Sequence, residues 1–284
     1  MKSKVFNRSL LAGVVISLCS GLLAPAALAA CAGTELSACP APFDAQLPDT
    51  HKMLTWSQSD RVIGFRNDYR NYAGDVFHHG NAAPLPAAAK PLKDASYRVN
   101  GKTYSLQDYL QRQNVSGMLV LKDGKIAWKY LGEGNTDATL WTSRSVGKSV
   151  VATLVGVAIK QGKIRSLDDL ITQYEPDLKG TAWDGVTLRQ LITHTSGVAW
   201  NEDYTNPKSD FAQLTECEAR PGTYACVRKL VAGLQRAHPA GQNWSYSSGG
   251  AWLLGDVLER ATGMPLAAYL QQSIWQPYGM ASDG

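Results

Sequence analysis

Ser145 and Lys148 lie three residues apart at the start of a long uncharged stretch of the chain. On a helix, side chains with this spacing lie on one face. A serine hydroxyl is a weak nucleophile at neutral pH and needs a base beside it. An amine can serve as that base where burial disfavours the charged ammonium. The pair therefore favours covalent catalysis, with Ser145 as the nucleophile and Lys148 as the activating base.

Two other interpretations of this segment need weighing. A Ser-x-x-Lys pattern also fits a helix-capping serine followed by a surface lysine, but the absence of charge between Lys148 and Lys160 favours a functional lysine. Gly147-Lys148-Ser149 suggests a phosphate-binding loop, yet that motif requires glycine at position 142, where Thr142 stands. The chain also lacks the Gly-x-Ser-x-Gly elbow of α/β-hydrolases.

Tyr246 is a candidate for a second proton-carrying group. A phenol placed between a serine and a lysine can pass a proton to a leaving group, if the ammonium nearby lowers its pKa. The alternative is a packed aromatic residue whose hydroxyl has found a hydrogen-bond partner.

Three histidines are further candidates. His194, in the run Leu191–Gly197, can be a general base, but we interpret it as a hydrogen-bonded residue of a structural turn. His78 and His79 can ligate a metal, yet no third ligand follows at a suitable spacing, so we expect them to be exposed to solvent. We predict neither a metal site nor a cofactor.

The elements that must position these residues follow from hydrophobic periodicity. Residues 118–130 predict a β-hairpin around Asp123-Gly124. Residues 148–161 predict a helix that is apolar on all sides and therefore buried, ending at Gly162. A second helix is predicted over 252–262, with Ser247 or Ser248 as its cap.

The remaining segments are less regular. Residues 167–193 predict short helices and turns, and residues 199–243 predict a long polar excursion of the kind that forms lids. Early strands followed by helices indicate an α+β fold in which a sheet carries a helical subdomain.

The first 29 residues predict a secretory signal peptide, with a basic start, an apolar centre and the small-residue pattern Ala27-Leu28-Ala29. An uncleaved membrane anchor is the minor alternative. Leu28-Ala29-Ala30-Cys31 also resembles a lipobox, in which Cys31 would carry a lipid. We favour ordinary cleavage and export to the periplasm or medium, with a lipoprotein anchored at Cys31 as the alternative.

The cysteine content agrees with export. Four of the five cysteines fall into two close pairs, Cys31 with Cys39 and Cys217 with Cys226, which predicts two short-loop disulfides.

The chain has 28 basic and 24 acidic residues. Without the three basic residues of the signal the counts are 25 and 24, a net charge of +1, so no basic patch favours nucleic-acid binding.

Several motifs together resemble the serine β-lactamases and penicillin-binding proteins, in particular the class C-like β-lactamase-related hydrolases. The resemblance covers roughly residues 100–280. Its segments are the hairpin ending in Trp128, Ser145-x-x-Lys148, Gln161–Ile164 with Leu167–Asp169, Leu191–Gly197, Pro239-Ala-Gly, Tyr246-Ser-Ser and Pro277–Met280.

The resemblance implies acyl-enzyme chemistry in an antiparallel sheet flanked by helices with a helical subdomain. Ser145 would attack an amide or ester carbonyl, while Lys148 and Tyr246 manage protons. The segment ending in Tyr204 is similar to the lid of the 6-aminohexanoate-dimer hydrolase subgroup. That similarity implies that Tyr204 contacts the leaving amine; an ordinary loop aromatic is the equal alternative. Ser248 stands where class C β-lactamases carry Asn, which favours esterases and amidases.

The family's third motif, Lys-Thr-Gly or similar on a C-terminal strand, does not follow Met280. We therefore expect a C-terminally truncated chain that lacks the last strands of the sheet. The expected divisions are a signal peptide over 1–29, an N-terminal arm and connector over 30–99, and a partial hydrolase domain over 100–284.

The sequence thus predicts a serine hydrolase that cleaves a small amide or ester through an acyl-enzyme on Ser145, with Tyr204 and Ser248 binding the substrate. A penicillin-recognising D-Ala-D-Ala peptidase or β-lactamase-like protein is one alternative. An inactive truncated remnant is another. Oligomeric state is not predicted.

Overall fold

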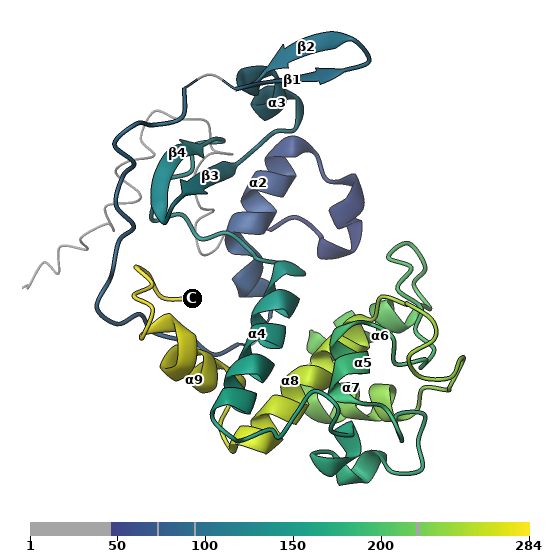
Figure 1. The fold of residues 1–284 in the computed structure, drawn as a ribbon. Helices are drawn as coiled ribbons and strands as arrows, with labels where there is room; N and C mark the ends of the chain where they lie inside the picture. Colours follow the sequence, from purple (N-terminus) through teal and green to yellow (C-terminus); the bar gives the residue numbers. More distant parts are fainter. Residues whose placement is uncertain (1–46, 73, 94, 220–221) are drawn as a thin grey trace, which may run out of the picture.

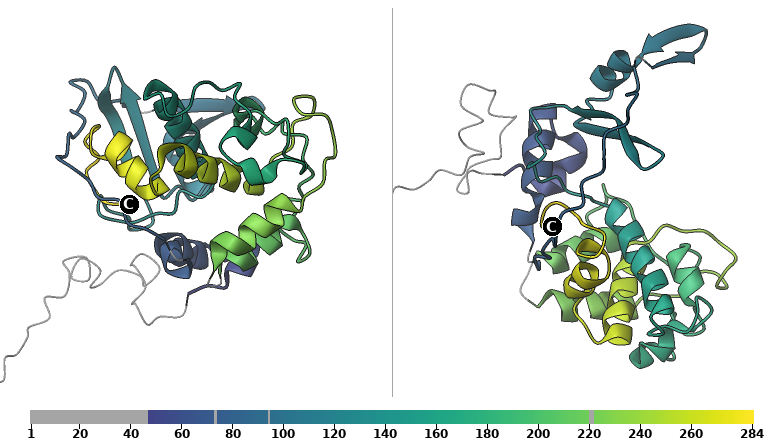
Figure 2. Two further views of the ribbon diagram at one scale, coloured as in Figure 1. Left: turned by 90° about the horizontal axis from the view of Figure 1, so that it is seen from below. Right: turned by 60° about the vertical axis from the view of Figure 1, so that its left-hand side comes forward.

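The computed structural model describes residues 47–72, 74–93, 95–219 and 222–284. The predicted signal peptide, Cys31 and Cys39 lie outside these ranges. The α+β prediction is confirmed: two small antiparallel sheets and many helices make up the described chain (Figure 1). The hairpins lie at one end of the molecule and most helices at the other, as Figure 1 and the right-hand view of Figure 2 show.

The predicted hairpin is present. β3 (Gly117–Lys122) pairs antiparallel with β4 (Lys125–Leu131). Asp123 and Gly124 join the strands with φ values of 52° and 70°, as the tight type I′ hairpin turn requires. From β4 the chain leads directly towards Ser145.

A second hairpin extends beyond the first. β1 (Ser96–Val99) pairs with β2 (Lys102–Ser105), and α3 (Leu106–Arg112) follows. The boundary expected between residues 99 and 100 falls in the turn of this hairpin. The division into an arm and a hydrolase domain itself stays a prediction.

α4 (Val146–Lys160) is the predicted central helix, and Gly162 follows its end with φ of 72°. Leu154, Val155 and Ala158 are buried in the hydrophobic core. Burial on all sides is not observed, because Val146 is 68% exposed and other residues of that flank are also open to solvent. The helix packs on the body through one face only.

The helical body surrounds α8 (Ser248–Thr262), which contains the second predicted helix. Ser247 caps α8 by accepting the Gly250 N–H at 2.9 Å. The other elements of the body are η4 (Ile171–Gln173), η5 (Pro176–Leu178), α5 (Leu188–Ile192), α6 (Asp210–Glu218), α7 (Thr223–Ala232), α9 (Leu266–Leu270) and the π-helical turn η6 (Gln271–Trp275). Trp183 fills its centre and donates from Nε1 to the carbonyl of Val231 at 2.8 Å.

The excursion predicted over 199–243 is not a continuous loop, since it contains the two helices α6 and α7. Few residues of these helices are buried, among them Leu214, Val227 and Val231. The mainly polar sequence therefore shows no clear helical periodicity, and the helices were not predicted. The Cys217–Cys226 disulfide is present and ties α6 to α7.

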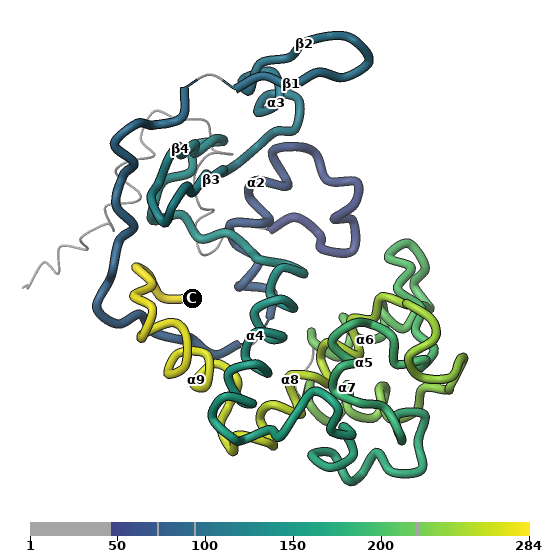
Figure 3. Tube along the Cα trace, viewed as in Figure 1, coloured from purple at the N-terminus to yellow at the C-terminus, as the bar shows by residue number. Residues whose placement is uncertain are grey.

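The described residues that precede β1 lie beside the start of α4, the C-terminal residues and β4. η2 (Thr50–Thr55), α2 (Gln58–Asn67) and η3 (Asp68–Asn71) lie beside the start of α4. The connector then runs past the C-terminal residues, where Ala83 N–H donates to the carbonyl of Gly279 at 2.9 Å. It continues along β4, forming a parallel bridge between Ala87 and Ile126 (Figure 3). None of the described helices is long and apolar enough to cross a bilayer.

Candidate active site

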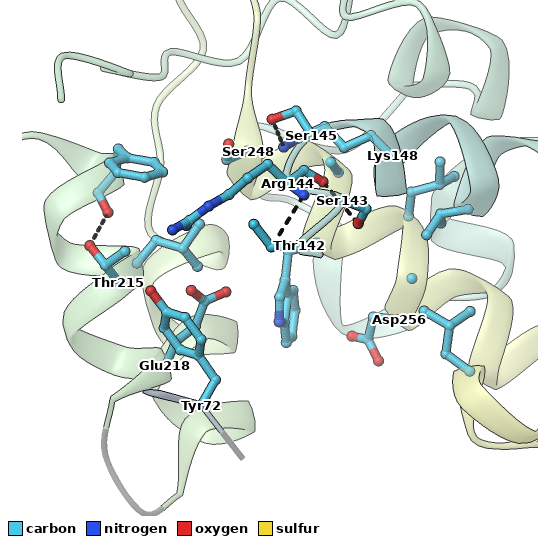
Figure 4. Close-up of a pocket in the computed structure, with 18 of the residues that line it drawn as sticks. Tyr72, Thr142, Ser143, Arg144, Ser145, Lys148, Thr215, Glu218, Ser248 and Asp256 are labelled. Carbon is cyan, nitrogen blue, oxygen red and sulfur yellow. Dashed lines mark hydrogen bonds between the residues drawn. The ribbon is translucent and has the colours of Figure 1, made fainter. Parts of the chain in front are cut away.

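Ser145 stands immediately before α4, but its side chain does not cap the helix. Its Oγ instead accepts hydrogen bonds from Lys148 Nζ at 3.1 Å and from the Tyr246 hydroxyl at 2.8 Å. Lys148 Nζ also lies 5.2 Å from the centre of the Tyr246 ring. The three residues predicted to be catalytic therefore form one hydrogen-bonded group (Figure 4 shows the bond between Ser145 and Lys148).

The turn around His194 holds Tyr246 in place. The His194 carbonyl accepts the Ser245 N–H at 2.8 Å, and its ring packs 4.7 Å from that of Tyr246. His194 has a positive φ of 56°. Its Nδ1 accepts a long hydrogen bond from Ser247 N–H at 3.3 Å. The structural-turn interpretation of His194 is thus confirmed.

Burial, with a further contribution from the charge of Lys148, lowers the pKa of His194. The imidazole is therefore neutral near pH 7. That state suits its contact with Tyr246, because a neutral ring adds no positive charge beside the Lys148 amine.

Glu202 organises the other two predicted residues. Its carboxylate accepts from the Ser248 hydroxyl at 2.6 Å, from the Ser248 N–H at 2.9 Å and from the Tyr204 hydroxyl at 3.0 Å. Trp200 Nε1 donates to the same carboxylate. Burial first, and then the hydrogen bond to Glu202, raise the pKa of Tyr204 to about 12. Tyr204 and Ser248 are thus tied to Glu202, and their predicted contacts with substrate stay predictions.

Sequence reasoning missed Glu202 as an anchor. It lies in the segment that carries the resemblance, but no spacing rule marks a carboxylate as the acceptor for donors up to 46 residues away. The close approach of Trp200 to Gly249, where a Cβ would come within 2.4 Å of the indole, supports the same arrangement.

The N-terminal segment fixes the residues that precede Ser145. The buried Asp68 carboxylate accepts from Thr142 Oγ1 at 3.0 Å and pairs with Arg144 Nη2 at 3.0 Å. Thr142 N–H donates to the carbonyl of Phe65 at 2.9 Å. Arg144 has a positive φ of 44°, an uncommon conformation for a residue other than glycine. This contact was also missed, because residues 47–72 carry no recognisable motif.

A pocket with a volume of about 1090 Å³ opens beside the nucleophile. Ser145, Lys148, Tyr204 and Ser248 line it, and Tyr246 joins them through its bond to Ser145. Further lining residues come from the N-terminal segment, from α6, and from α7 and α8. Among those labelled in Figure 4 are Tyr72, Thr215, Glu218 and Asp256.

His78 and His79 lie elsewhere, and their side chains are exposed. His78 Nδ1 and His79 N–H both contact the carboxylate of Asp283, at 2.9 Å and 2.8 Å. Within the described ranges, no three His, Cys, Asp or Glu side chains gather in a way that could hold a metal ion.

Comparison with known proteins places this geometry in context. The family model described as Beta-lactamase matches residues 105–284. The chain is 27% identical over 205 residues to the 6-aminohexanoate-dimer hydrolase of Paenarthrobacter ureafaciens, covering 67% of this chain and 52% of that protein. It is 30% identical over 218 residues to Esterase EstB of Burkholderia gladioli, covering 72% of this chain and 55% of that protein.

A Beta-lactamase of Pseudomonas fluorescens is 26% identical over 191 residues, which cover 62% of this chain and 48% of that protein. A solved structure from Bacillus anthracis, provisionally assigned as a 6-aminohexanoate-dimer hydrolase, superimposes with a TM-score of 0.72. It covers 86% of this chain and 64% of that one at 18% identity, a likeness in fold. The chain spans about half the length of the relatives it matches in sequence.

Proposed function

This chain belongs to the Beta-lactamase family, and we propose that it is a serine hydrolase that cleaves a small amide or ester through an acyl-enzyme on Ser145. The observation that carries the proposal is the position of Ser145 Oγ, which lies within hydrogen-bond distance of both an amine and a phenol. Hydrogen-bonded proximity to a base is what a weak hydroxyl nucleophile requires.

The proposed first step forms a bond between Ser145 Oγ and the substrate carbonyl carbon. The hydroxyl proton passes to the Lys148 amine. The tetrahedral intermediate then breaks its bond to the leaving oxygen or nitrogen, which takes the phenolic proton of Tyr246. Lys148 returns its proton to the phenolate, so the two groups end in their starting states.

The backbone N–H of Ser145 is available for the developing oxyanion. It donates to no acceptor within the described part of the chain, and it lies at the beginning of α4, where the helix dipole favours negative charge. Water then attacks the acyl carbon and gives one proton to the Lys148 and Tyr246 pair; the bond from that carbon to Ser145 Oγ breaks, the pair returns the proton to Oγ, and the acid product leaves.

A fluorophosphonate probe tests the nucleophile, because it labels activated serines. We expect mass spectrometry to find the adduct on Ser145 and hydrolysis of p-nitrophenyl acetate to be lost in Ser145→Ala. Ser149→Ala is the matched control, since Ser149 lies one turn further along α4 with an exposed side chain; it should label normally. Adducts that persist in Ser145→Ala would refute the assignment.

The relatives named Beta-lactamase motivate a second candidate function, a protein acylated by penicillins. Incubation with benzylpenicillin separates the two. A stable penicilloyl adduct without turnover, together with failure to hydrolyse simple esters, would favour this second function. Rapid ester hydrolysis without a lasting adduct supports the proposal above.

A further inference from the structure

Glu218 is the last residue of α6 and lines the same pocket as Ser145 and Lys148. Its side chain is partly buried rather than exposed to bulk water. Figure 4 shows it reaching the pocket from α6, whereas Ser145 and Lys148 reach it from the start of α4. The pocket therefore brings together the nucleophile and an acidic side chain from a different element.

The carboxylate of Glu218 has no hydrogen bond or ion pair with any residue within the described ranges. The two basic groups that share its pocket are engaged elsewhere: Arg144 pairs with Asp68, and Lys148 donates to Ser145. Tyr72 lies close enough for the charge of Glu218 to raise the pKa of its phenol, as a smaller contribution after burial and Asp68. The pocket thus contains a carboxylate without a cation in contact with it.

This placement is unfavourable in the absence of a ligand. Burial raises the pKa of Glu218, and only the charge of Lys148 opposes that effect. A negative charge at the C-terminal end of a helix also opposes the helix dipole. A cation in the pocket would relieve both costs. Local arrangements that violate ordinary stability rules are expected at functional sites.

We propose that Glu218 is a specificity-determining residue that binds a positively charged group of the substrate, such as an ammonium or guanidinium, so that the enzyme prefers cationic amides or esters. The inference rests on the proposed function, because it requires the carbonyl to lie at Ser145 while the cation lies at Glu218. Thr215, one turn earlier on α6, lines the same wall, but its hydroxyl donates to carbonyls of its own helix at 2.9 Å and 3.0 Å.

A different role for Glu218 must be separated from this one. As a distant counter-charge for Lys148, it would influence proton transfer with every substrate. As a cation-binding group, it influences only substrates that carry the cation. Comparison of charged and neutral substrates of identical shape distinguishes the two roles.

The experiment uses the p-nitrophenyl ester of γ-trimethylammonio-butyrate and its neutral isostere, in which carbon replaces nitrogen. A second pair places the charge on the leaving group, as m-trimethylammonio-phenyl acetate and m-tert-butylphenyl acetate. We expect the wild type to prefer the cationic member of at least one pair by about tenfold in kcat/KM, the ratio that one modest ion pair provides.

Glu218→Gln should remove that preference, lowering kcat/KM about tenfold for the cationic ester and less than twofold for its neutral isostere. Glu216→Gln is the matched control, because Glu216 lies on the same helix with an exposed side chain and does not line the pocket; it should keep the preference. An equal loss for both members of each pair, with a shifted pH profile, would assign Glu218 to Lys148 and overturn the inference. An unchanged preference would also overturn it.

A binding measurement keeps the inference separate from the proposed function. In Ser145→Ala, calorimetry with butyltrimethylammonium chloride should show a dissociation constant about tenfold lower than in Ser145→Ala with Glu218→Gln. Binding that depends on Glu218, in a wild type that hydrolyses no ester, would refute the proposed function alone. Ester hydrolysis without binding that depends on Glu218 would refute the inference alone.

Discussion

At the scale of single residues, the site depends on what the Ser145 hydroxyl contacts. A serine before a helix ordinarily caps it, but here the helix gives up that cap and Ser145 Oγ accepts from an amine and a phenol. The first turn of α4 is thus less stable than it could be, and the hydroxyl is free to react. The sequence predicted this pair because three-residue spacing on a helix fixes side-chain proximity without help from the rest of the fold.

Tyr246→Phe removes the phenol and keeps the ring that packs on His194. We expect kcat for ester hydrolysis to fall by about 10²–10⁴-fold, the usual contribution of a positioned proton-transfer group. Thermal unfolding should change little. Tyr278→Phe serves as the control, since Tyr278 is exposed and does not line the pocket. Full activity in Tyr246→Phe would leave Lys148 as the sole proton carrier.

Contacts made over long sequence distances could not be predicted from residue types. Glu202 accepts a hydrogen bond from Ser248, 46 residues away in the sequence. Asp68 accepts one from Thr142, 74 residues away. Neither belongs to a motif with fixed spacing, so their roles appear only when the folded chain brings their partners together. Sequence reasoning therefore found the reacting groups and missed the groups that hold them.

At the scale of elements, three parts of the fold were predictable because each carries a strong local signal. α4 has an uncharged stretch, the β3–β4 hairpin has an Asp-Gly turn, and α8 has a capping serine at its start and a glycine at its end. The β1–β2 hairpin was missed although Asn100-Gly101 is an equally strong turn signal. α6 and α7 were missed for a different reason. Each buries only two residues, so tertiary packing and not hydrophobic periodicity decides their conformation.

The contact between η3 and the residues before α4 yields a prediction about catalysis. Asp68→Asn should break the ion pair with Arg144 and keep an acceptor for Thr142, lowering the rate of Ser145 labelling by a fluorophosphonate about tenfold, because the hydroxyl is less well positioned. Asp68→Ala should lower it further. Asp137→Asn, which disrupts an exposed pair with Lys129, should label at the wild-type rate. A uniform loss of folded protein in both Asp68 variants would instead indicate a purely structural role.

An ion cluster joins η5, α7 and α8. Glu175, with a side chain 0% exposed, pairs with Arg228 at 2.7 Å and Arg260 at 3.0 Å, and Arg228 also binds Asp256 at 2.8 Å. Asp177 lies 3.8 Å from both guanidinium groups, so three carboxylates share two cations. Burial, followed by the charge of Asp256, raises the pKa of Glu175 to about 7.

The raised pKa of Glu175 predicts a pH-dependent stability. Below about pH 4.5 the carboxyl is protonated in both the folded and the unfolded state, and its contribution to the free energy of unfolding is fully present. As pH rises towards 7 the unfolded state loses this proton first, so the free energy of unfolding falls by on the order of 3 kcal/mol. Glu175→Gln should therefore gain stability relative to the wild type between pH 5 and pH 8. Urea unfolding at both pH values measures this change, and a difference independent of pH would contradict it.

The disulfide between α6 and α7 closes a short loop and should stabilise this part of the body. Replacing both Cys217 and Cys226 with serine should lower the free energy of unfolding by about 2.5 kcal/mol, the entropic cost of a loop with nine residues' separation. Because Glu218 follows Cys217 directly, the cation preference of the pocket should weaken as well. Denaturant unfolding and the paired esters measure the two effects. Unchanged stability would show that α6 and α7 are held by packing alone.

At the scale of the whole molecule, we propose that the protein is exported and acts outside the cytoplasm. The basic and apolar first 29 residues motivate this proposal, and the Cys217–Cys226 bridge is compatible with an oxidising compartment. Mass spectrometry of the mature protein should find an N-terminus at Ala30 or Cys31. A lipid-modified Cys31 would identify a lipoprotein, and an intact Met1 would contradict cleavage.

The overall class of the fold was predictable, whereas the arrangement of its parts was not. Early strand signals followed by a run of helix signals identified the α+β class. The path of residues 74–93, which pass the C-terminal segment and then border β4, left no periodic pattern because this connector is rich in proline and alanine. Its position depends on partners almost 200 residues further along the chain.

The sequence separation of 101 residues between Ser145 and Tyr246 has a consequence for biosynthesis. Contacts between such distant residues form late in folding, after local helices and hairpins. A chain still being synthesised or translocated would thus hold the Ser145–Lys148 pair on α4 without the phenol of Tyr246. During refolding, helical circular dichroism should recover before full esterase activity does, because the phenol reaches Ser145 only when the distant segments meet.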